Sequence, residues 1–361
     1  MKKIAVIPGD GIGNEVMAEG IKVLKSYATL RNLPEFEFTY FPWGCEYYNE
    51  TGEMMPENGL EILSGYDAIL LGAVGYPGVP DHISLRDLLL KIRQGFDQSV
   101  NLRPIKLLRG APCPLKNKSP EDIDFVVVRE NVEGEYSGDG HFVKEDGEIT
   151  AAYQTGVFTK AKTDRLIRYA FELAAKRSKG KKLTSTTKSN ALNYSMVFWD
   201  ERFKEISREF PEVKTESNHV DAISMYFVQR PESFDVVVAS NLFGDIITDL
   251  GAALQGGLGF AASANLNLEG VYPSMFEPVH GSAPEIAGKQ IANPMAMIWT
   301  AKMMLDHLYP TLSHETIVET LEELLIEEKH LTRDLGGSAS TSEVGDAICQ
   351  RLEALVKIKH G

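Results

Sequence analysis

Short apolar runs alternate with longer amphipathic stretches through the first half of the chain. KIAVIP at 3–8, FEFTYF at 36–41 and DAILLGAV at 67–74 each predict a strand, because β-branched and aromatic residues are concentrated in them. The stretches 15–30 and 57–63 predict helices between these strands. Strands that alternate with helices predict βαβ units and a mostly parallel sheet, which places the chain in the α/β class.

The second half begins with a different pattern. FDVVVAS at 234–240 predicts a buried strand, and NLFGDIITDLG directly after it predicts a helix. The region after Gly256, as far as Ser282, is predicted to consist mainly of loops. Three further helices are predicted toward the C-terminus, at 294–307, 315–329 and 342–357.

Residues 133–160 are rich in glycine, threonine, tyrosine and charge, with hairpin-like turns expected at Asp139-Gly140 and Asp146-Gly147. A two-stranded ribbon with so little core is marginally stable in water. We therefore expect this ribbon to pack on a second subunit. A surface loop without such a partner is the alternative.

Three glycines, Gly9, Gly11 and Gly13, lie at the first strand-to-helix turn. Their GxGxG spacing differs from the dinucleotide-binding fingerprint, and no acidic residue closes the next strand at the expected distance. The sequence therefore does not predict a Rossmann fold. We expect the glycines to let a tight loop approach a ligand or another loop.

Length and composition exclude several classes of protein. With 361 residues, 43% of them apolar, the chain is long enough for two domains with sizeable cores. No run approaches the length of a membrane span and no signal peptide is predicted, so we expect no membrane partner. Three cysteines without a CxxC pair suit the reducing cytoplasm. A net charge of −14 argues against a nucleic-acid partner.

Basic residues are concentrated between Arg86 and Arg109, where six of them face only two acids and give this window a charge of +4. An anion-binding site and a solvated basic face are both compatible with this pattern.

An acidic pair follows the strand predicted at 234–240. Asp245 and Asp249 are four residues apart, so a helix would carry both on one face, with Cβ atoms roughly 5–6 Å apart. In open α/β sheets, ligands bind just beyond the carboxyl ends of strands. Because two such acids repel each other, the pair indicates a cation site, to which Asp221 in NHVDAISM is a third candidate. A helix with two solvated acids is the simpler alternative.

Seven motifs now make the chain resemble a known family: PGDGIG, NLRP at 101, VVRENVEGEY at 127, TKSN at 187, SNLFGDIITDL at 240, EPVHGSAP at 277 and IANP at 291. In this order they are similar to motifs of the β-hydroxyacid oxidative decarboxylases, the family of isocitrate, isopropylmalate, tartrate and D-malate dehydrogenases. The segments CEYYNETGEMMPENGLEIL and GAVGYPGVPDHISL resemble the tartrate and D-malate branch most.

The resemblance implies the substrate and metal ligands. Three arginines are implied to bind the carboxylates of a small dicarboxylate 2-hydroxy acid, a task that suits their planar, permanently charged fork: Arg93, Arg103 and Arg129. Three aspartates are implied to hold Mg²⁺ or Mn²⁺ through hard oxygen donors: Asp221, Asp245 and Asp249. A requirement for K⁺ stays open.

The resemblance also implies the catalytic and cofactor-binding residues. Lys188 is implied to take the substrate's hydroxyl proton, and Tyr136 to protonate the enolate that remains after CO₂ leaves. For the dinucleotide, the implied contacts are His280 and Asn293 to the adenine, and the backbone of Gly281, Ser282 and Ala283 to the phosphates. Glu285 stands where family members that use NAD carry aspartate, and its carboxylate would repel the 2′-phosphate of NADP, so we expect NAD.

The choice of substrate depends on Leu89 and Leu90, about one turn before Arg93. Two leucines disfavour the third carboxylate of isocitrate and would suit isopropylmalate, whereas the surrounding PGVPDHISL favours the tartrate and D-malate branch. We expect NAD-dependent oxidative decarboxylation of D-malate to pyruvate and CO₂, together with oxidation of tartrate. The alternatives are an isopropylmalate dehydrogenase of leucine synthesis and a catalytically silent nucleotide-binding subunit.

The implied fold is the two-domain fold of isopropylmalate dehydrogenase with a protruding β-ribbon arm. Residues 1–98 and 255–361 are expected to form a terminal domain with most of the NAD site. Residues 99–254 are expected to form a central domain with the metal ligands, the general base and an arm at about 133–160. The active site is expected between the domains of a homodimer, with Lys188 and Asp221 donated across subunits.

Overall fold

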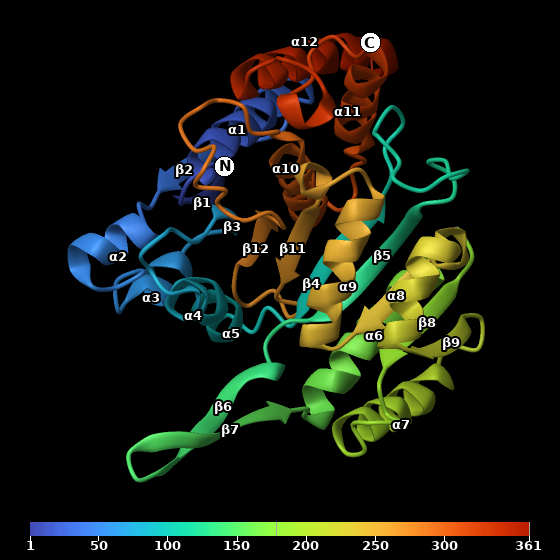
Figure 1. Cartoon of the computed structure of the whole chain (residues 1–361). Coiled ribbons are helices and arrows are strands. Elements are labelled where there is room, and N and C mark those ends of the chain that lie inside the picture. The colour runs from blue at the N-terminus through green and yellow to red at the C-terminus, as the bar shows by residue number, and fades with distance from the viewer. Residues whose placement is uncertain (178, 361) are drawn as a thin grey trace. The chain divides into compact units, whose positions relative to one another are not determined.

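A computed structural model describes residues 1–177 and 179–360 of the chain (Figure 1). They form two compact units. The first unit contains Met1–Gln98, Lys106–Pro120 and Ala252–Gly361, and the second contains Ser99–Ile105 and Glu121–Gly251.

These units differ from the expected domains in residues 106–120 and 252–254, which group with the terminal segments. Hydrogen bonds explain the difference. The amide of Lys106 donates to Gln255, and Arg109 forms an ion pair with Glu322 at 2.7 Å.

Five strands form the sheet of the first unit, in the order β2-β1-β3-β12-β11. All neighbouring pairs are parallel except β11 with β12. Their bounds are β1 Lys2–Gly9, β2 Phe36–Tyr40, β3 Ala68–Ala73, β11 Ala262–Leu266 and β12 Ser274–Pro278.

Five strands of the second unit follow the order β4-β5-β10-β8-β9. The pairs β5–β10, β10–β8 and β8–β9 are parallel. Their bounds are β4 Val100–Lys106, β5 Asp124–Glu130, β8 Lys182–Thr187, β9 Lys214–His219 and β10 Val236–Ala239. The predicted α/β class with mostly parallel strands is confirmed.

Helices of the first unit pack on its strands and on one another. α10 contacts α1, α11, β11 and β12. These contacts explain why every residue from Met295 to Leu305 is buried. The bounds are α1 Gly13–Leu30, α2 Cys45–Thr51, α3 Gly59–Leu63, α4 Asp81–Ser84, α5 Lys91–Gly95, α10 Met295–Leu308, α11 Glu315–Glu327 and α12 Thr341–His360, with 3₁₀ turns at Leu258–Phe260 and Arg333–Leu335.

Between α4 and α5 the helix widens into a π-helical segment, η1, from Leu85 to Leu90. The amide of Lys91 donates to the carbonyl of Arg86, five residues earlier. Such segments are rare in globular proteins and often occur at functional sites.

In the second unit, α6 packs on β5, β8 and β10, while α7 packs on β8 and α6, and α8 packs on β8 and β9. The bounds are α6 Lys160–Lys176, α7 Ser195–Ser207, α8 Val220–Gln229 and α9 Asn241–Leu254, with a 3₁₀ turn at Pro231–Ser233. Buried strands such as VVVA in β10 are apolar throughout because helices cover parallel sheets on both faces.

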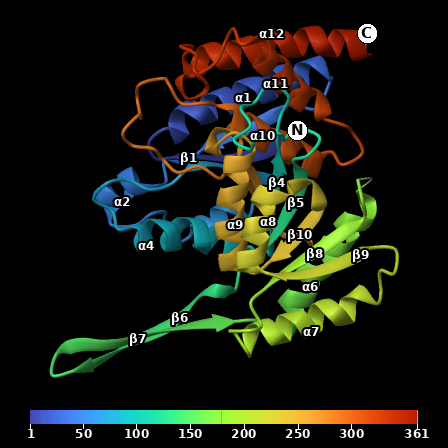
Figure 2. The same ribbon diagram turned by 45° about the vertical axis from the view of Figure 1, so that its right-hand side comes forward.

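The ribbon consists of β6 (Gly134–Glu145) and β7 (Glu148–Val157), which pair with each other in a separate antiparallel sheet. Figures 1 and 2 show it extending away from the other elements of its own unit. Phe142, Ile149 and Tyr153 are 64%, 57% and 58% exposed along it.

One of the two expected ribbon turns is wrong. Asp146 and Gly147 do form the turn, with φ angles of 50° and 86°. Asp139 and Gly140 instead lie inside β6 and pair with β7. An irregularity in pairing between Gly134 and Asp139 accommodates this segment without reversing the chain.

The prediction of loops from Gly256 to Ser282 is also wrong, because β11 and β12 lie there and are fully buried. Polar residues within β11 made this segment look like a loop in the sequence. Ser263 and Asn265 are buried on β11, where Ser263 donates to the carbonyl of Glu277 at 2.8 Å and Asn265 to that of Met275 at 3.2 Å. Hydrogen bonds within the sheet thus allow these polar side chains to be buried.

The glycine loop after β1 approaches another loop, as predicted. Gly11 has φ +55°, and a Cβ atom there would lie 2.1 Å from the carbonyl oxygen of Ser282. The amide of Ile12 donates to the same oxygen at 2.8 Å. The glycines therefore bring the 282 loop close to the start of α1.

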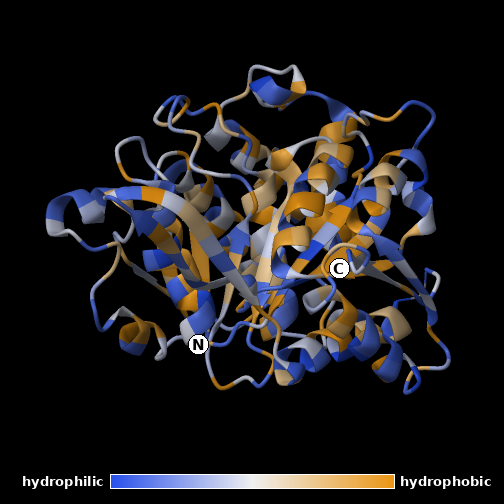
Figure 3. Cartoon of the chain, turned by 60° about the horizontal axis from the view of Figure 1, so that its bottom comes forward, coloured by the Kyte–Doolittle hydropathy of each residue, from blue (hydrophilic) through white to orange (hydrophobic). Residues whose placement is uncertain are grey.

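Figure 3 shows the strands of the sheets mainly in the colours of apolar residues, whereas peripheral loops are mainly hydrophilic. Within the described part of the chain, no helix is both long and apolar enough to cross a bilayer.

Candidate active site

Helix α9 carries the acidic pair and begins directly after β10. The carboxylate of Glu135 accepts hydrogen bonds from Ser240 Oγ at 2.8 Å and from the amide of Leu242 at 3.1 Å. This satisfies an amide that the first turn of a helix otherwise leaves unpaired. Asp245 and Asp249 consequently lie on successive turns of one helix, as their spacing predicts.

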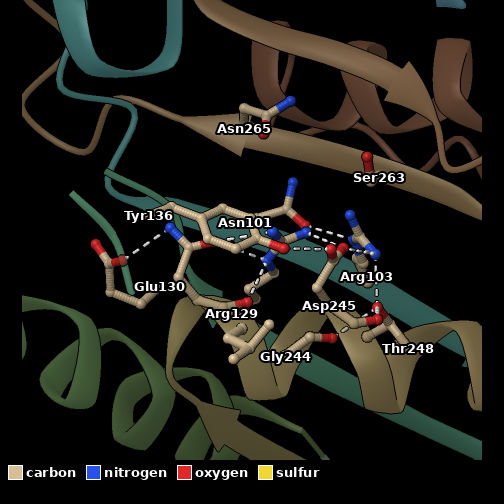
Figure 4. A network of polar contacts seen from close by, with 12 residues as sticks. Asn101, Arg103, Arg129, Glu130, Tyr136, Gly244, Asp245, Thr248, Ser263 and Asn265 are labelled. Carbon is tan, nitrogen blue, oxygen red and sulfur yellow. Dashed lines mark hydrogen bonds and ion pairs between the residues drawn. The ribbon is translucent and has the colours of Figure 1, made fainter. Parts of the chain in front are cut away.

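Arg129, buried near the carboxyl end of β5, is held against this helix (Figure 4). Its Nη1 donates to Asp245 Oδ1 at 2.6 Å. Its Nε and Nη2 donate to Asn241 Oδ1 at 3.2 and 2.8 Å, and Nε also donates to the Asn241 carbonyl at 2.9 Å. Gly244 makes room for the arginine, because a Cβ atom there would lie 2.5 Å from Arg129 Cγ.

Arg103, on β4, is oriented mainly by neutral oxygens. Its Nε donates to Asn101 Oδ1 at 2.6 Å and its Nη1 to Thr248 Oγ1 at 2.5 Å. Nη1 also lies 3.5 Å from Asp245 Oδ1. Arg103 and Arg129 are therefore both directed at the carboxylate of Asp245 (Figure 4).

The phenol of Tyr136 completes this group by donating to Asp245 Oδ2 at 2.8 Å. Burial and the negative charge of Asp245 raise the pKa of Tyr136 to about 12, although Arg129 opposes the shift. The side chain is therefore protonated at neutral pH and can serve as a proton donor.

Asp249 is exposed and lies one turn after Asp245 on the same helix. Loss of solvent raises the pKa of Asp249, the positive charge of Arg103 opposes this, and the nearby Asp245 raises it further. Two carboxylates that disfavour each other's ionisation are a fitting donor set for a small divalent cation with hard oxygen preference.

Lys188 and Asp221 form a second group within the same unit. Lys188 follows β8, Asp221 lies in the first turn of α8, and the Nζ–Oδ1 distance is 2.8 Å. The hydrogen bond from Lys188 lowers the pKa of Asp221. Among the described residues, no three acidic, histidine or cysteine side chains come close enough to hold a metal. One chain thus pairs Asp245 with Asp249, and Lys188 with Asp221.

In the first unit, Arg93 and Glu277 form a buried ion pair. Glu277 also accepts a hydrogen bond from Asn265 Nδ2 at 2.9 Å. On the helix before Arg93, Leu89 packs at the edge of the hydrophobic core and Leu90 is buried, at the end of η1.

The residues expected to bind NAD also lie in the first unit. Gly281, Ser282 and Ala283 line a pocket together with residues 74–81. His280 Nδ1 lies 3.0 Å from the Gly281 carbonyl, while its Nε2 is buried without a partner among the described residues. Burial lowers the pKa of His280, so the ring is neutral and Nε2 suits the edge of an adenine.

Glu285 is exposed and directly follows Pro284, which lines this pocket. The side chain of Asn293 forms hydrogen bonds within the fold. Its Oδ1 accepts from the amide of Met295 at 3.0 Å, at the start of α10, and its Nδ2 donates to Asp334 at 3.1 Å. The pocket and the unpartnered His280 nitrogen fit a dinucleotide.

Sequence reasoning missed the residues that support these side chains. All seven lie inside the motifs that carry the family resemblance, so motif membership was the available signal. They are Asn101, Glu130, Glu135, Asn241, Gly244, Thr248 and Glu277.

Comparisons with known proteins agree with the motifs. A family model described as isocitrate/isopropylmalate dehydrogenase matches residues 3–348. A probable tartrate dehydrogenase/decarboxylase of Bacillus subtilis (strain 168) is 51% identical over 355 residues, 98% of each chain. The D-malate dehydrogenase [decarboxylating] of Escherichia coli (strain K12) is 52% identical over 355 residues, 96% of this chain and 98% of the relative.

A solved structure extends the likeness to the fold. Isocitrate dehydrogenase from Methylococcus capsulatus superposes with a TM-score of 0.88 at 34% identity, covering 98% of this chain and all of that one (100%). Both the resemblance to this family and the expected fold are confirmed. The chain therefore belongs to the isocitrate/isopropylmalate dehydrogenase family.

Proposed function

We propose that this protein is an NAD-dependent, metal-dependent dehydrogenase that oxidatively decarboxylates D-malate to pyruvate and CO₂ and also oxidises tartrate. The observation that carries the proposal is the convergence of Arg103, Arg129 and Tyr136 on Asp245. Relatives about half identical over nearly the whole chain bear the names tartrate dehydrogenase/decarboxylase and D-malate dehydrogenase.

Arg103 and Arg129 would bind substrate carboxylates together with Arg93. Guanidinium forks held by neighbouring oxygens lose little conformational freedom when a ligand binds. Asn101 and Thr248 orient Arg103 through neutral oxygens, which add no negative charge beside its guanidinium.

The bound groups would supply chemistry that side chains lack: NAD accepts the hydride, and Mg²⁺ or Mn²⁺ held by Asp221, Asp245 and Asp249 favours the departure of CO₂. The chain's own residues would move the protons. Lys188 takes the proton of the substrate hydroxyl before oxidation. Tyr136, protonated at neutral pH, returns a proton to carbon after decarboxylation.

The active site would be shared in a homodimer. Lys188 and Asp221 of one subunit would complete the group around Asp245 of the other, because each chain holds the two groups separately. The ribbon, with Phe142 and Tyr153 exposed, offers apolar surface to a partner subunit. Since all three cysteines are free, we assign the enzyme to the cytoplasm.

Isopropylmalate dehydrogenase activity is the second candidate, because Leu89 and the buried Leu90 provide an apolar approach to Arg93. Comparing kcat/KM for D-malate, tartrate and isopropylmalate with NAD and Mg²⁺ tests the proposal. We expect D-malate to rank first. A clear preference for isopropylmalate would assign the enzyme to leucine synthesis, and no NADH formation from any of them would favour a silent nucleotide-binding subunit.

A further inference from the structure

We propose that Glu130 and Asn241 are positioning residues that orient the guanidinium of Arg129 for a substrate carboxylate. The inference rests on the proposed function, because it assigns Arg129 to substrate binding. Neither residue was expected at the site from its sequence motif, and both are buried.

Glu130, at the end of β5, is surrounded by hydrogen-bond donors. Its Oε1 accepts from the amides of Val132 and Glu133 at 2.9 and 3.0 Å. Its Oε2 accepts from the Glu133 amide at 3.1 Å and from Asn241 Nδ2 at 3.1 Å. In each of these contacts a carboxyl oxygen of Glu130 is the acceptor, as the chemistry of a carboxyl group allows.

Asn241, the first residue of α9, uses both ends of its amide. Its Nδ2 donates to Glu130 Oε2 and to the carbonyl of Glu133, each at 3.1 Å. Its Oδ1 accepts from Arg129 Nε and Nη2. Because the two ends of an amide have nearly the same shape, their partners decide which end faces which way.

The Glu130 side chain and the Glu133 carbonyl together determine this orientation. If the Asn241 amide turned over, its oxygen would face the oxygens of Glu130 and Glu133, and its NH₂ would face the guanidinium. Both contacts would be repulsive in a buried site, where an unmade hydrogen bond costs about 1–3 kcal/mol. The Glu130 carboxylate therefore helps to keep the Asn241 oxygen on Arg129.

The Asn241 side chain is neutral, so its contact with Arg129 adds no negative charge beside the guanidinium. Glu130 contacts Asn241, and the Asn241 Oδ1 accepts from Arg129, so one edge of the guanidinium contacts a neutral oxygen. Its Nη1 remains directed to Asp245 on the other side. A guanidinium fixed in this way is preorganised for a second anion without being neutralised by its support.

Glu130→Gln tests the inference, because a glutamine can turn its NH₂ toward Asn241 and so weaken the preference for one amide orientation. The matched control is Glu133→Gln, a neighbouring buried glutamate whose carboxylate bonds to Thr159 instead. We would measure the Kd of D-malate calorimetrically with Mg²⁺ and without NAD, the KM of D-malate and of NAD, and kcat.

We expect Glu130→Gln to raise the Kd and KM of D-malate about tenfold, the factor that corresponds to one modest hydrogen bond, with the KM of NAD changed less than twofold. The control should leave the Kd of D-malate near the wild-type value. Should Glu130→Gln fail to fold, Asn241→Asp replaces it, because a carboxylate there would neutralise Arg129 and weaken D-malate binding as well.

Equal D-malate affinity in wild type and in a folded Glu130→Gln or Asn241→Asp variant would overturn the positioning role. So would a loss shared equally by D-malate and NAD, since that pattern indicates general damage. If the wild-type protein neither binds nor oxidises any hydroxy acid of the panel, the proposed function itself fails, which is a different result.

Discussion

The phenol of Tyr136 donates a hydrogen bond to Asp245 Oδ2, with 2.8 Å between the two oxygens. An expected proton donor is thus bonded to an expected metal ligand. The bond and the burial together keep the phenol protonated, with a pKa of about 12. The same carboxylate that would bind the cation therefore also places the acid for the last step.

Tyr136→Phe should lower kcat for D-malate decarboxylation by roughly 10²–10⁴, the usual range for a removed general acid. The KM of D-malate should change less, because Arg103 and Arg129 keep their places. Steady-state kinetics with NADH absorbance measures both constants. A variant with full kcat would assign the protonation step to another group.

Hybrid dimers test the shared active site. If Lys188 and Asp221 complete the partner's site, a hybrid of one Lys188→Met chain and one Asp245→Asn chain has one intact site and one doubly damaged site. Hybrids isolated with two affinity tags should then show about half of the wild-type kcat, because a twofold dimer contains two sites. Both homodimers should be nearly inactive. Hybrids as inactive as their parents would place Lys188 and Asp245 together in a site formed within one chain.

Arg93→Met should destabilise the protein as well as weaken substrate binding. The substitution would leave the buried carboxylate of Glu277 without its ion-pair partner. The hydrogen bond from Asn265 to this carboxylate would remain. Removing one member of a buried pair costs about 3–5 kcal/mol. Urea unfolding measures the loss, and Arg86→Met, at an exposed residue of the same helix, is the control.

Glu130 should also make stability depend on pH. Burial raises the pKa of Glu130 from 4.5 to about 7, against the opposing amides of Val132 and Glu133. Its contribution to folding is therefore complete below pH 4.5 and is lost as the pH rises through about 7. The free energy of unfolding of wild type, relative to Glu130→Gln, should fall by about 3 kcal/mol at most between pH 4.5 and pH 8. A constant difference across this range would contradict the prediction.

Gly244→Ala should raise the KM of D-malate, because the new methyl group would displace Arg129. Alanine favours a helix interior over glycine by about 1 kcal/mol, so the helix itself should not be weakened. A matched change at an open glycine, Gly52→Ala, has no neighbour within 4 Å but has φ +82°, and it reports backbone strain alone. Kinetics and thermal unfolding of the two variants separate displacement from strain.

The sequence was sufficient to predict those helices and strands that a local pattern of apolar and polar residues determines. The apolar runs of β1, β3 and β10 and the four-residue spacing of Asp245 and Asp249 predicted elements that the structure contains. Strand β11 was missed because Ser263 and Asn265 look like loop residues until β12 supplies their partners.

The same limit applies to the site. Resemblance pointed to the arginines and aspartates, but not to their supports. The contact between Asn241 and Glu130 joins residues 111 positions apart, and that between Lys188 and Asp221 joins residues 33 apart. Such pairings depend on how strands and helices are placed in three dimensions, which no local pattern encodes.

The π-helical segment from Leu85 to Leu90 has a consequence for how substrate preference could evolve. Each residue turns an α-helix by about 100°. Deleting one residue in the wide turn would restore the ordinary pitch and rotate the preceding residues together, while Arg93 stayed beside Glu277. A single codon loss could thus change which side chains of this segment face the substrate in the function that we propose, and leave the Arg93–Glu277 ion pair in place.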